Sequence, residues 1–344
     1  MAGQTKKSVF RILFLLAGVC SLYFVPWILV KAWIRPLPDS VQEQVEEAVE
    51  LGFEGVVVYV DEKGEKPQSY MAGWHNRETQ EPARDSAYFK IGSIKKLYDA
   101  VAVTKLVKAG VLSLDKTLAD YLPALAGKIE NAAQITVRQM VQHRSGLPNY
   151  TDTPNFWAEP TTTFDNSIAL VFNKPALFEP GTDYAYCNTN YLLLNRIMDE
   201  VLNQPNFEFK QAAILNPLGL SNTFASIREV NMENMMSGYH LGHPHDLKTD
   251  DVGMVARAED VAVFIRALQD GSVFGPGERE IYSELYKFEH SGWVPGYQSF
   301  ANYYPDSDAV VVAFYSTTDP DLLYWNLAEI INTRIGRLLK SSKN

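Results

Sequence analysis

The strand-forming segments of this chain lie at its two ends. Residues 55–74 place β-branched and aromatic residues on both sides of a turn at Gly64, a pattern that predicts a hairpin. Residues 297–305 and 308–316 have the same character, whereas the sequence between about 91 and 286 shows mainly helical periodicity. Strands so far apart can share one sheet only if the chain between them forms a helical insert. The pattern therefore predicts an α+β fold whose sheet is built from both chain ends.

Helices are expected beside this sheet, around a core of ordinary size. Residues 40–51 place valines at helical spacing with glutamates between them, and a last helix is expected from about Asp321 to Leu339. The 344 residues and 46% hydrophobic composition suffice for a packed core. A formal net charge of -10 argues against a nucleic-acid surface and favours small substrates. With only Cys20 and Cys187 present, no disulfide framework is expected.

The N-terminal segment predicts a membrane anchor. Residues 12–30 are nineteen consecutive residues without a charge, roughly the length of a bilayer-spanning helix. A small excess of basic residues before this run favours a cytoplasmic N-terminus and an exported remainder. A cleaved signal peptide is the alternative, but no clear small-residue cleavage site is present. We therefore expect residues 1–36 to be a cytoplasmic tip and uncleaved signal anchor, and residues 37–344 a periplasmic or extracellular domain.

The segment YFKIGSIKKLYDA, residues 88–100, places Ser93 three residues before Lys96. On a helix these two side chains are neighbours, with Cβ atoms about 5–6 Å apart. Apolar residues follow Lys96 along its stripe, whereas Lys95 and Asp99 form an i,i+4 pair suited to the exposed side. A lysine among apolar groups near a helix N-terminus loses its proton more readily and can then activate a serine. A capping serine beside a solvated lysine is the alternative at this point.

A second polar segment is YAYCNTNYLLL, residues 184–194. If its first part is extended, Tyr186 and Asn188 point to one side and Cys187 to the other. The phenol could relay a proton if a neighbouring ammonium lowered its pKa, and the amide could hold a lysine and a substrate carbonyl. Cys187 is interpreted as a small buried hydrophobe. By itself the segment fits an ordinary loop that buries a tyrosine better than it fits a catalytic site.

A third segment, EHSGWVPGYQSF, spans residues 289–300, and in it His290, Ser291 and Gly292 precede a predicted strand. The glycine would allow a ligand to lie against the backbone. Alone, this segment also fits a routine strand entry with a surface histidine. Three more histidines lie in YHLGHPHD, residues 239–246, where glycine and proline interrupt any helix, so we interpret them as a polar turn rather than a metal site.

These three segments, in this order, resemble the serine penicillin-recognising family, specifically its class C β-lactamase and DD-peptidase branch. The resemblance extends over about residues 40–340. Four flanking stretches share it: HRSGLPNY (143–150), FEPGTDYAYCN (178–188), LNPLGLSNTFAS (215–226) and ARAEDVAVFIRAL (256–268).

The resemblance implies a β-lactamase/transpeptidase-like fold, with an antiparallel sheet flanked by helices and a mostly helical inserted subdomain. It implies that Ser93 is the acylated nucleophile, with Lys96 and Tyr186 as the proton-transfer pair and Asn188 as a positioning group. The backbone N–H groups of Ser93 and Trp293 would form the oxyanion hole.

One departure from the family pattern bears on substrate choice. His290, Ser291 and Gly292 stand where most β-lactamases of this fold have Lys-Thr-Gly, so a permanent cation is replaced by a group that is mostly neutral near neutral pH. We place His290 in the expected catalytic set, and Ser291, Gly292 and Trp293 on the expected substrate-binding edge. The substitution makes β-lactam hydrolysis the least favoured catalytic option.

The sequence therefore predicts a membrane-anchored serine hydrolase that works through an acyl-enzyme at Ser93. Its expected substrates are small amides, esters or short peptides, with D-Ala-D-Ala-type and other peptidoglycan-derived peptides among the candidates. No metal or organic cofactor and no nucleic-acid partner are expected, and the membrane is contacted through the N-terminal helix. A β-lactamase is one alternative, and a catalytically idle penicillin-binding-like protein of the cell wall is another.

Overall fold

The computed structural model describes residues 14, 20–161, 163–249 and 253–341. At its centre is an antiparallel six-stranded sheet with strand order β3-β2-β1-β10-β9-β8. Strand β1 (Gly55–Glu62) lies beside β10 (Ala309–Tyr315), so the sheet joins the two ends of the chain as predicted. The other strands of this sheet are β2 (Gln68–Asn76), β3 (Glu81–Pro82), β8 (His290–Val294) and β9 (Tyr297–Tyr304).

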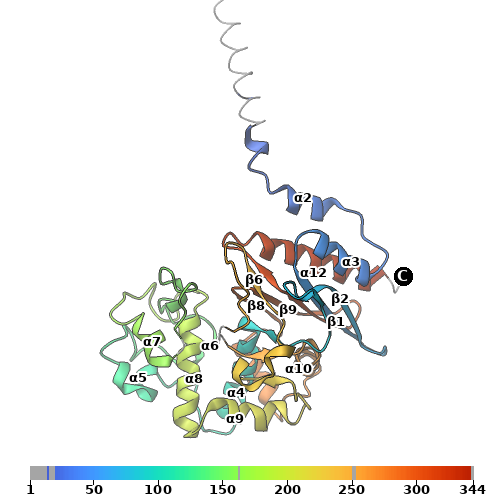
Figure 1. Cartoon of the computed structure of the whole chain (residues 1–344). Helices are drawn as coiled ribbons and strands as arrows, with labels where there is room; N and C mark the ends of the chain where they lie inside the picture. The colour runs from blue at the N-terminus through green and yellow to red at the C-terminus, as the bar shows by residue number, and fades with distance from the viewer. Residues whose placement is uncertain (1–13, 15–19, 162, 250–252, 342–344) are drawn as a thin grey trace, which may run out of the picture.

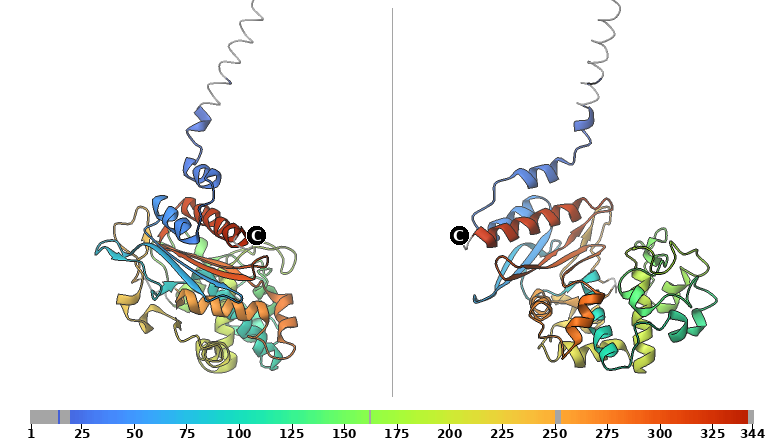
Figure 2. Two further views of the ribbon diagram at one scale, coloured as in Figure 1. Left: turned by 90° about the vertical axis from the view of Figure 1, so that its right-hand side faces the viewer. Right: turned by 180° about the vertical axis from the view of Figure 1, so that it is seen from behind.

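Helices cover both faces of the sheet (Figure 2). On one face lie α3 (Val41–Glu50) and α12 (Leu323–Ser341), and on the other lies α10 (Ala258–Asp270). Successive side chains of a strand point to opposite faces, so Val56 and Val58 pack beneath α3 and α12, whereas Val57 joins the core on the other side. This double burial explains why β1 is an almost uninterrupted apolar run.

A mostly helical lobe lies beside the sheet (Figure 1), as predicted, with α4 (Lys95–Lys108) and α8 (Asn188–Leu202) at its centre. The structure also contains short strands that the sequence analysis did not predict. The small strands are β4 (Phe89–Lys90), β5 (Thr223–Phe224) and β7 (Val255–Ala256), which form one sheet, and β6 (Tyr239–His240), which pairs with β11 (Thr317–Thr318). The remaining α-helices are α5 (Leu118–Tyr121), α6 (Val137–Val141), α7 (Phe164–Ala169), α9 (Asn206–Lys210) and α11 (Glu278–Leu285). Short helical turns are η1 (Gly92–Ile94), η2 (Pro123–Leu125), η3 (Tyr150–Asp152), η4 (Gln211–Leu215), η5 (Ile227–Glu229) and η6 (Met232–Asn234).

The predicted membrane helix over residues 12–30 lies partly outside the described residues. Its described part is not one continuous helix, because residues 23–26 are non-helical and α2 (Trp27–Ile34) begins after Pro26. Within the described ranges, no helix combines the length and the apolar character needed to cross a bilayer. Helix α2 packs against α12, and Arg334 of α12 donates hydrogen bonds to the backbone carbonyls that follow α2.

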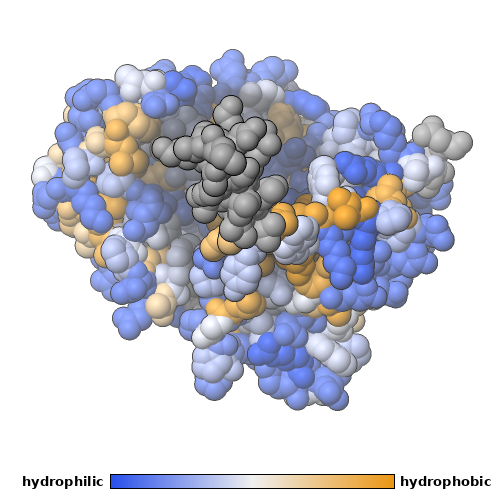
Figure 3. All heavy atoms as spheres, turned by 90° about the horizontal axis from the view of Figure 1, so that it is seen from above, coloured by the Kyte–Doolittle hydropathy of each residue, from blue (hydrophilic) through white to orange (hydrophobic). Residues whose placement is uncertain are grey.

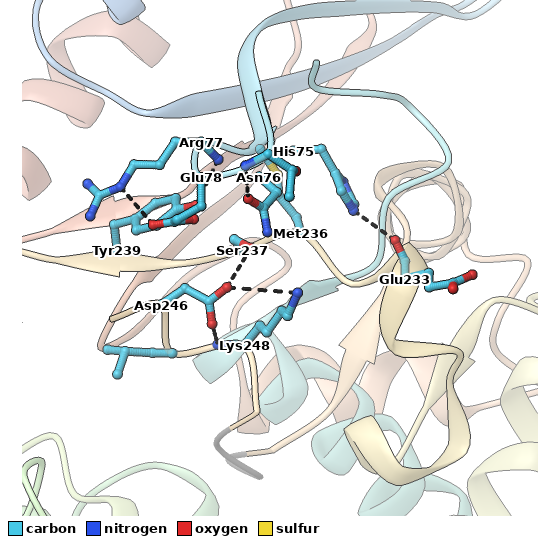
Figure 4. Close-up of polar contacts among 12 residues, drawn as sticks. His75, Asn76, Arg77, Glu78, Glu233, Met236, Ser237, Tyr239, Asp246 and Lys248 are labelled. Carbon is cyan, nitrogen blue, oxygen red and sulfur yellow. Dashed lines mark hydrogen bonds and ion pairs between the residues drawn. The ribbon is translucent and has the colours of Figure 1, made fainter. Parts of the chain in front are cut away.

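A polar cluster fastens the end of β2 to the segment around β6 (Figure 4). The Tyr239 hydroxyl donates to Glu78 at 2.6 Å and accepts from the Arg77 N–H at 2.9 Å. The Ser237 hydroxyl donates to Asp246 at 2.7 Å. These contacts hold the turn after β6 in place.

The histidine-rich turn lies next to the β8–β9 hairpin. The His240 Nδ1 lies 2.8 Å from the Thr318 Oγ1, which also accepts from the Gly296 N–H at 2.7 Å. The His240 ring lies 6.3 Å from the Trp293 ring, measured between centroids. The turn therefore supports the end of β8.

Candidate active site

Two glycines bring the Ser93 turn against β8. Gly92 has a φ of +51°, and a Cβ on it would lie 2.9 Å from the Trp293 nitrogen. A Cβ on Gly292 would lie 2.1 Å from the Ile91 carbonyl oxygen. Only residues without a side chain permit this approach. At Gly292 we had expected a ligand against the backbone, but the structure places the backbone of the Ser93 turn there.

Two side chains contact the Ser93 hydroxyl, and a third side chain holds one of them. The Lys96 Nζ donates to the Ser93 Oγ at 3.0 Å and to the Asn188 Oδ1 at 2.7 Å. The Tyr186 hydroxyl donates to the Ser93 Oγ at 2.7 Å from the opposite segment. The four residues that the first two sequence segments contributed to the expected catalytic set thus form one connected group.

Lys96 is buried, and within the part of the chain that the structure describes no carboxylate is among its hydrogen-bond partners. Burial, helped by the charge of Lys95, lowers its pKa to about 7, although Asp99 opposes the shift. Near neutral pH, the Lys96 amine is therefore neutral in a large fraction of the protein molecules. In that form the Nζ lone pair can accept the Ser93 proton across the same 3.0 Å contact.

Tyr186 differs from the sequence prediction. We had considered a phenol whose pKa is lowered by a neighbouring ammonium, but burial raises the pKa of Tyr186 to about 12, against a small opposing effect of the Ser93 hydrogen bond. Lys96 is the ammonium that could lower the pKa of Tyr186, but it loses its own proton near pH 7. The phenol therefore stays protonated and donates to Ser93, which suits a proton carrier to a leaving group.

Asn188 is held by residues that the sequence analysis did not single out. It opens α8, its backbone N–H donates to the Asn149 Oδ1 at 2.9 Å, and its Nδ2 donates to the Thr151 Oγ1 at 2.9 Å. These bonds turn its carbonyl oxygen toward Lys96. Asn149 lies in the HRSGLPNY stretch and Thr151 directly follows it, so the resemblance could have pointed to both.

The Lys95–Asp99 pair forms as predicted, at 2.6 Å, but not on an exposed face. Asp99 is fully buried and also forms an ion pair with the buried Lys210 of α9. Burial alone would raise the pKa of Asp99, but Lys210 and Lys95 hold it well below its usual range. The first turns of α4 are therefore covered on both sides, because α9 packs where solvent was expected.

Strand β8 is one of the two edge strands of the six-stranded sheet, and its open edge faces the Ser93 turn. Val294 and Tyr297 close the tight turn between β8 and β9. Along these antiparallel strands, residue pairs that exchange backbone hydrogen bonds alternate with residue pairs that do not. This alternation turns the Trp293 N–H away from β9 toward Ser93, whose own N–H lies in the first turn of a helix. The Trp293 and Ser93 N–H groups are therefore the candidate pair of backbone donors for an oxyanion.

His290 is buried behind Tyr186, with 6.2 Å between ring centroids. Its Nδ1 contacts the Ser291 carbonyl oxygen and must carry the proton, so its Nε2 accepts from the Tyr286 hydroxyl at 3.0 Å. Burial, together with Lys287 and Lys96, places its pKa well below the usual range. His290 is therefore a neutral, hydrogen-bonded group rather than a cation for a substrate carboxylate.

His143 also packs against Tyr186. Its Nδ1 accepts from the Cys187 N–H at 3.1 Å, and its ring lies 4.5 Å from the Tyr186 ring. Its φ of +57° is unusual for a residue with a side chain. Burial lowers its pKa to about 3. Burial also raises the pKa of the Cys187 thiol, in agreement with an unreactive packing residue.

A cleft of about 430 Å³ opens beside the nucleophile. Ser93, Lys96 and Asn188 line it, and Trp157 and Trp293 form an aromatic wall. Among the predicted residues, His290, Ser291 and Gly292 do not line this cleft, and Tyr186 borders a second cavity on its other side. The sequence offered no signal for Trp157, which lies in a loop without periodicity.

Comparison with known proteins shows the family to which the chain belongs. The family model for beta-lactamases matches residues 31–287. The chain belongs to the beta-lactamase family. Members similar to it include a beta-lactamase of Pseudomonas fluorescens, 27% identical over 60% of this chain and 55% of the relative, and the esterase EstB of Burkholderia gladioli, 24% identical over 65% of this chain and 59% of the relative. The chain thus spans little more than half the length of these curated relatives.

The fold of this beta-lactamase family member also matches solved structures. A D-amino acid amidase from Ochrobactrum anthropi superposes with a TM-score of 0.76 over 88% of this chain and 98% of that chain, at 21% identity. At this identity the match establishes the fold. The predicted β-lactamase/transpeptidase-like α+β fold is thereby confirmed.

Proposed function

We propose that this beta-lactamase family member is a serine hydrolase that cleaves small amides or esters through an acyl-enzyme at Ser93. The main support for this proposal is the contact of the Ser93 hydroxyl with Lys96, a buried lysine that deprotonates near neutral pH. An unassisted serine is a weak nucleophile, and a neutral amine in hydrogen-bond reach removes that obstacle. The intact group argues against the alternative of a catalytically idle binding protein.

The reaction follows from the positions of the donors and acceptors. Lys96 takes the Ser93 proton as the Oγ attacks the substrate carbonyl carbon. The oxygen that becomes negative is held by the backbone N–H groups of Ser93 and Trp293. When the tetrahedral adduct collapses, the leaving group receives a proton from Tyr186, which regains one from Lys96. Water then attacks the carbonyl carbon of the acyl-enzyme. Tyr186 and Lys96 accept a proton from the water and return one to the Ser93 Oγ as the acyl group leaves.

The substrate class is narrowed by the neutral His290. Peptides of the D-Ala-D-Ala type, amides of D-amino acids and simple esters all offer the required carbonyl, and relatives carry names of the esterase and amidase kinds. The second candidate, β-lactam hydrolysis, is supported by the beta-lactamase relative. We rank β-lactams lower, and D-Ala-D-Ala-type peptides below amides and esters without a carboxylate, because the cation that commonly faces a substrate carboxylate in this fold is replaced by a buried neutral imidazole.

Covalent labelling tests the proposal. A fluorophosphonate probe should label the wild-type protein, and Ser93→Ala should abolish labelling because the hydroxyl activated by Lys96 is gone. Ser272→Ala, at an exposed serine outside the cleft, is the matched control and should label at the wild-type rate. Equal labelling of the Ser93→Ala variant would exclude Ser93 as the nucleophile. Nitrophenyl esters, D-amino acid amides and a chromogenic cephalosporin then rank the substrates.

We further propose that residues 1–36 anchor the protein in a membrane, with the catalytic domain outside the cytoplasm. Support comes from the uncharged run and from exposed apolar side chains at Phe24, Trp27, Trp33 and Ile34. Figure 3 looks down on this face, where hydrophobic residues interrupt a mostly hydrophilic surface. Aromatic residues of this kind are enriched where a protein meets the bilayer surface.

Fractionation of a bacterial host that expresses the full chain tests the anchor. The protein should stay in the membrane pellet after alkaline carbonate extraction, and a protease added to spheroplasts should digest its catalytic domain. Recovery of the full-length protein in the carbonate supernatant would contradict anchoring. Protection in intact spheroplasts, with digestion only after lysis, would contradict the orientation.

A further inference from the structure

Two tryptophans from different parts of the fold meet beside the nucleophile. Trp157 follows η3 in the helical lobe, and Trp293 lies on β8 of the sheet. Their ring centroids are 5.4 Å apart at an interplanar angle of 85°. Both rings are only partly buried, and both line the cleft that contains Ser93. An apolar wall of this size in contact with solvent needs an explanation, since its burial would be favourable.

The pair is supported from both sides, so its shape does not depend on a ligand. Phe156 packs against Trp157 at 5.0 Å and is itself met by Tyr150 at 5.2 Å. His240 lies behind Trp293, in the turn that the polar cluster of Figure 4 holds in place. The indoles are therefore preorganised, which lowers the entropic cost of placing a flat group against them.

The charged groups of the cleft do not compete for such a ligand. Of the described residues that line it, the basic ones are Lys95 and Lys96. Lys95 is held by Asp99 at 2.6 Å and by the Asn195 Oδ1 at 3.0 Å, and Lys96 is engaged by Ser93 and Asn188. A carboxylate on the substrate would therefore find no free cation among these lining residues, whereas an aromatic group would find an aromatic wall.

We infer that Trp157 and Trp293 form an aromatic subsite that binds a flat, uncharged group of the substrate next to the scissile carbonyl. The substrates would then be aryl- or arylalkyl-bearing amides and esters without a carboxylate near the reacting bond. The inference rests on the proposed acyl transfer at Ser93 and adds the class of substrate that this site selects.

Boronic acids test the inference, because boron adds to the activated serine and its substituent occupies the place of the acyl group. Inhibition constants of methylboronic acid and benzylboronic acid are measured by competition with the fluorophosphonate probe. The wild-type protein should bind the benzyl compound about tenfold or more tightly than the methyl compound. Trp157→Ala should reduce this ratio by about fivefold to tenfold, and Trp157→Phe, which keeps an aromatic ring, by less.

Trp74→Ala, at a tryptophan of β2 that does not line the cleft, is the matched control and should leave the ratio unchanged. A wild-type ratio near one, or a ratio that survives Trp157→Ala in a variant with an unchanged melting temperature, would overturn the subsite. Tighter binding of a carboxylated benzylboronic acid than of the parent compound would overturn its preference for uncharged groups.

The same experiment separates the two proposals. If neither the probe nor any boronic acid reacts at Ser93, the proposed function fails and the subsite inference falls with it. If both boronic acids bind at Ser93 without discrimination, the hydrolase proposal stands and only the subsite is lost.

Discussion

Lys96 on α4 and Lys210 on α9 are both buried lysines, yet their surroundings differ. Lys210 forms an ion pair with Asp99, and its pKa is lowered to about 8 by burial despite that carboxylate. Among the described residues, the hydrogen-bond partners of Lys96 are the neutral oxygen atoms of Ser93 and Asn188, and its pKa falls to about 7. The comparison shows that two packed helices can hold a structural lysine, which is fixed by a carboxylate, and a reactive lysine, which can exchange its proton with a nucleophile.

The largest difference between the two sites should appear when the reactive lysine is removed. Lys96→Met should slow fluorophosphonate labelling about 10²–10⁴-fold, because Ser93 loses its general base. Its free energy of unfolding should stay within about 1 kcal/mol of the wild-type value, because no carboxylate is left unpaired and the lost hydrogen bond to Asn188 is offset by removal of a buried amine. Labelling kinetics and urea denaturation measure both quantities.

A loss of about 3 kcal/mol or more in Lys96→Met would show that Lys96 also has a structural role. Labelling at the wild-type rate would show that another group is the base.

The structural site should respond in the opposite way. Asp99→Asn leaves Lys210 and Lys95 without their carboxylate, and breaking a buried ion pair in this way should cost about 3–5 kcal/mol of unfolding free energy. The control is Asp115→Asn, at an exposed carboxylate, which should change stability by no more than about 0.5 kcal/mol. Urea denaturation of the two variants makes the comparison, and equal stabilities would mean that the Asp99 ion pairs do not hold the fold.

The smallest expected effect concerns the charge of Lys95, which lies next to Lys96 in the sequence. Lys95 lowers the pKa of Lys96 by charge repulsion, so Lys95→Gln should raise that pKa and move the acidic limb of the labelling rate to higher pH by up to about one unit. Lys105→Gln removes a lysine of the same helix that pairs with Glu278 outside the cleft, and it should leave the limb in place. If both variants or neither shift the limb, Lys95 does not set the proton affinity of Lys96.

The sequence predicted the features that local spacing and resemblance determine. The sheet from both chain ends follows from strand periodicity, and the approach of Ser93 to Lys96 follows from helical spacing. The burial of Asp99 could not be predicted, because Lys210 lies more than a hundred residues away in the sequence. The periodicity of α4 does not indicate that α9 packs over Asp99. The sequence also did not reveal that burial would raise the pKa of Tyr186, since burial depends on the packed lobe rather than on neighbouring residues.

The account depends most on the claim that Lys96 is a neutral base for Ser93 near neutral pH. The pH dependence of Ser93 labelling in the wild-type protein, followed from about pH 5 to about pH 9, tests it most directly. Because only the neutral amine accepts the serine proton, the rate should rise about tenfold per pH unit at low pH and level off with a midpoint near the Lys96 pKa of about 7. A rate that is independent of pH over this range, or one that still rises about tenfold per unit at its upper end, would contradict the claim.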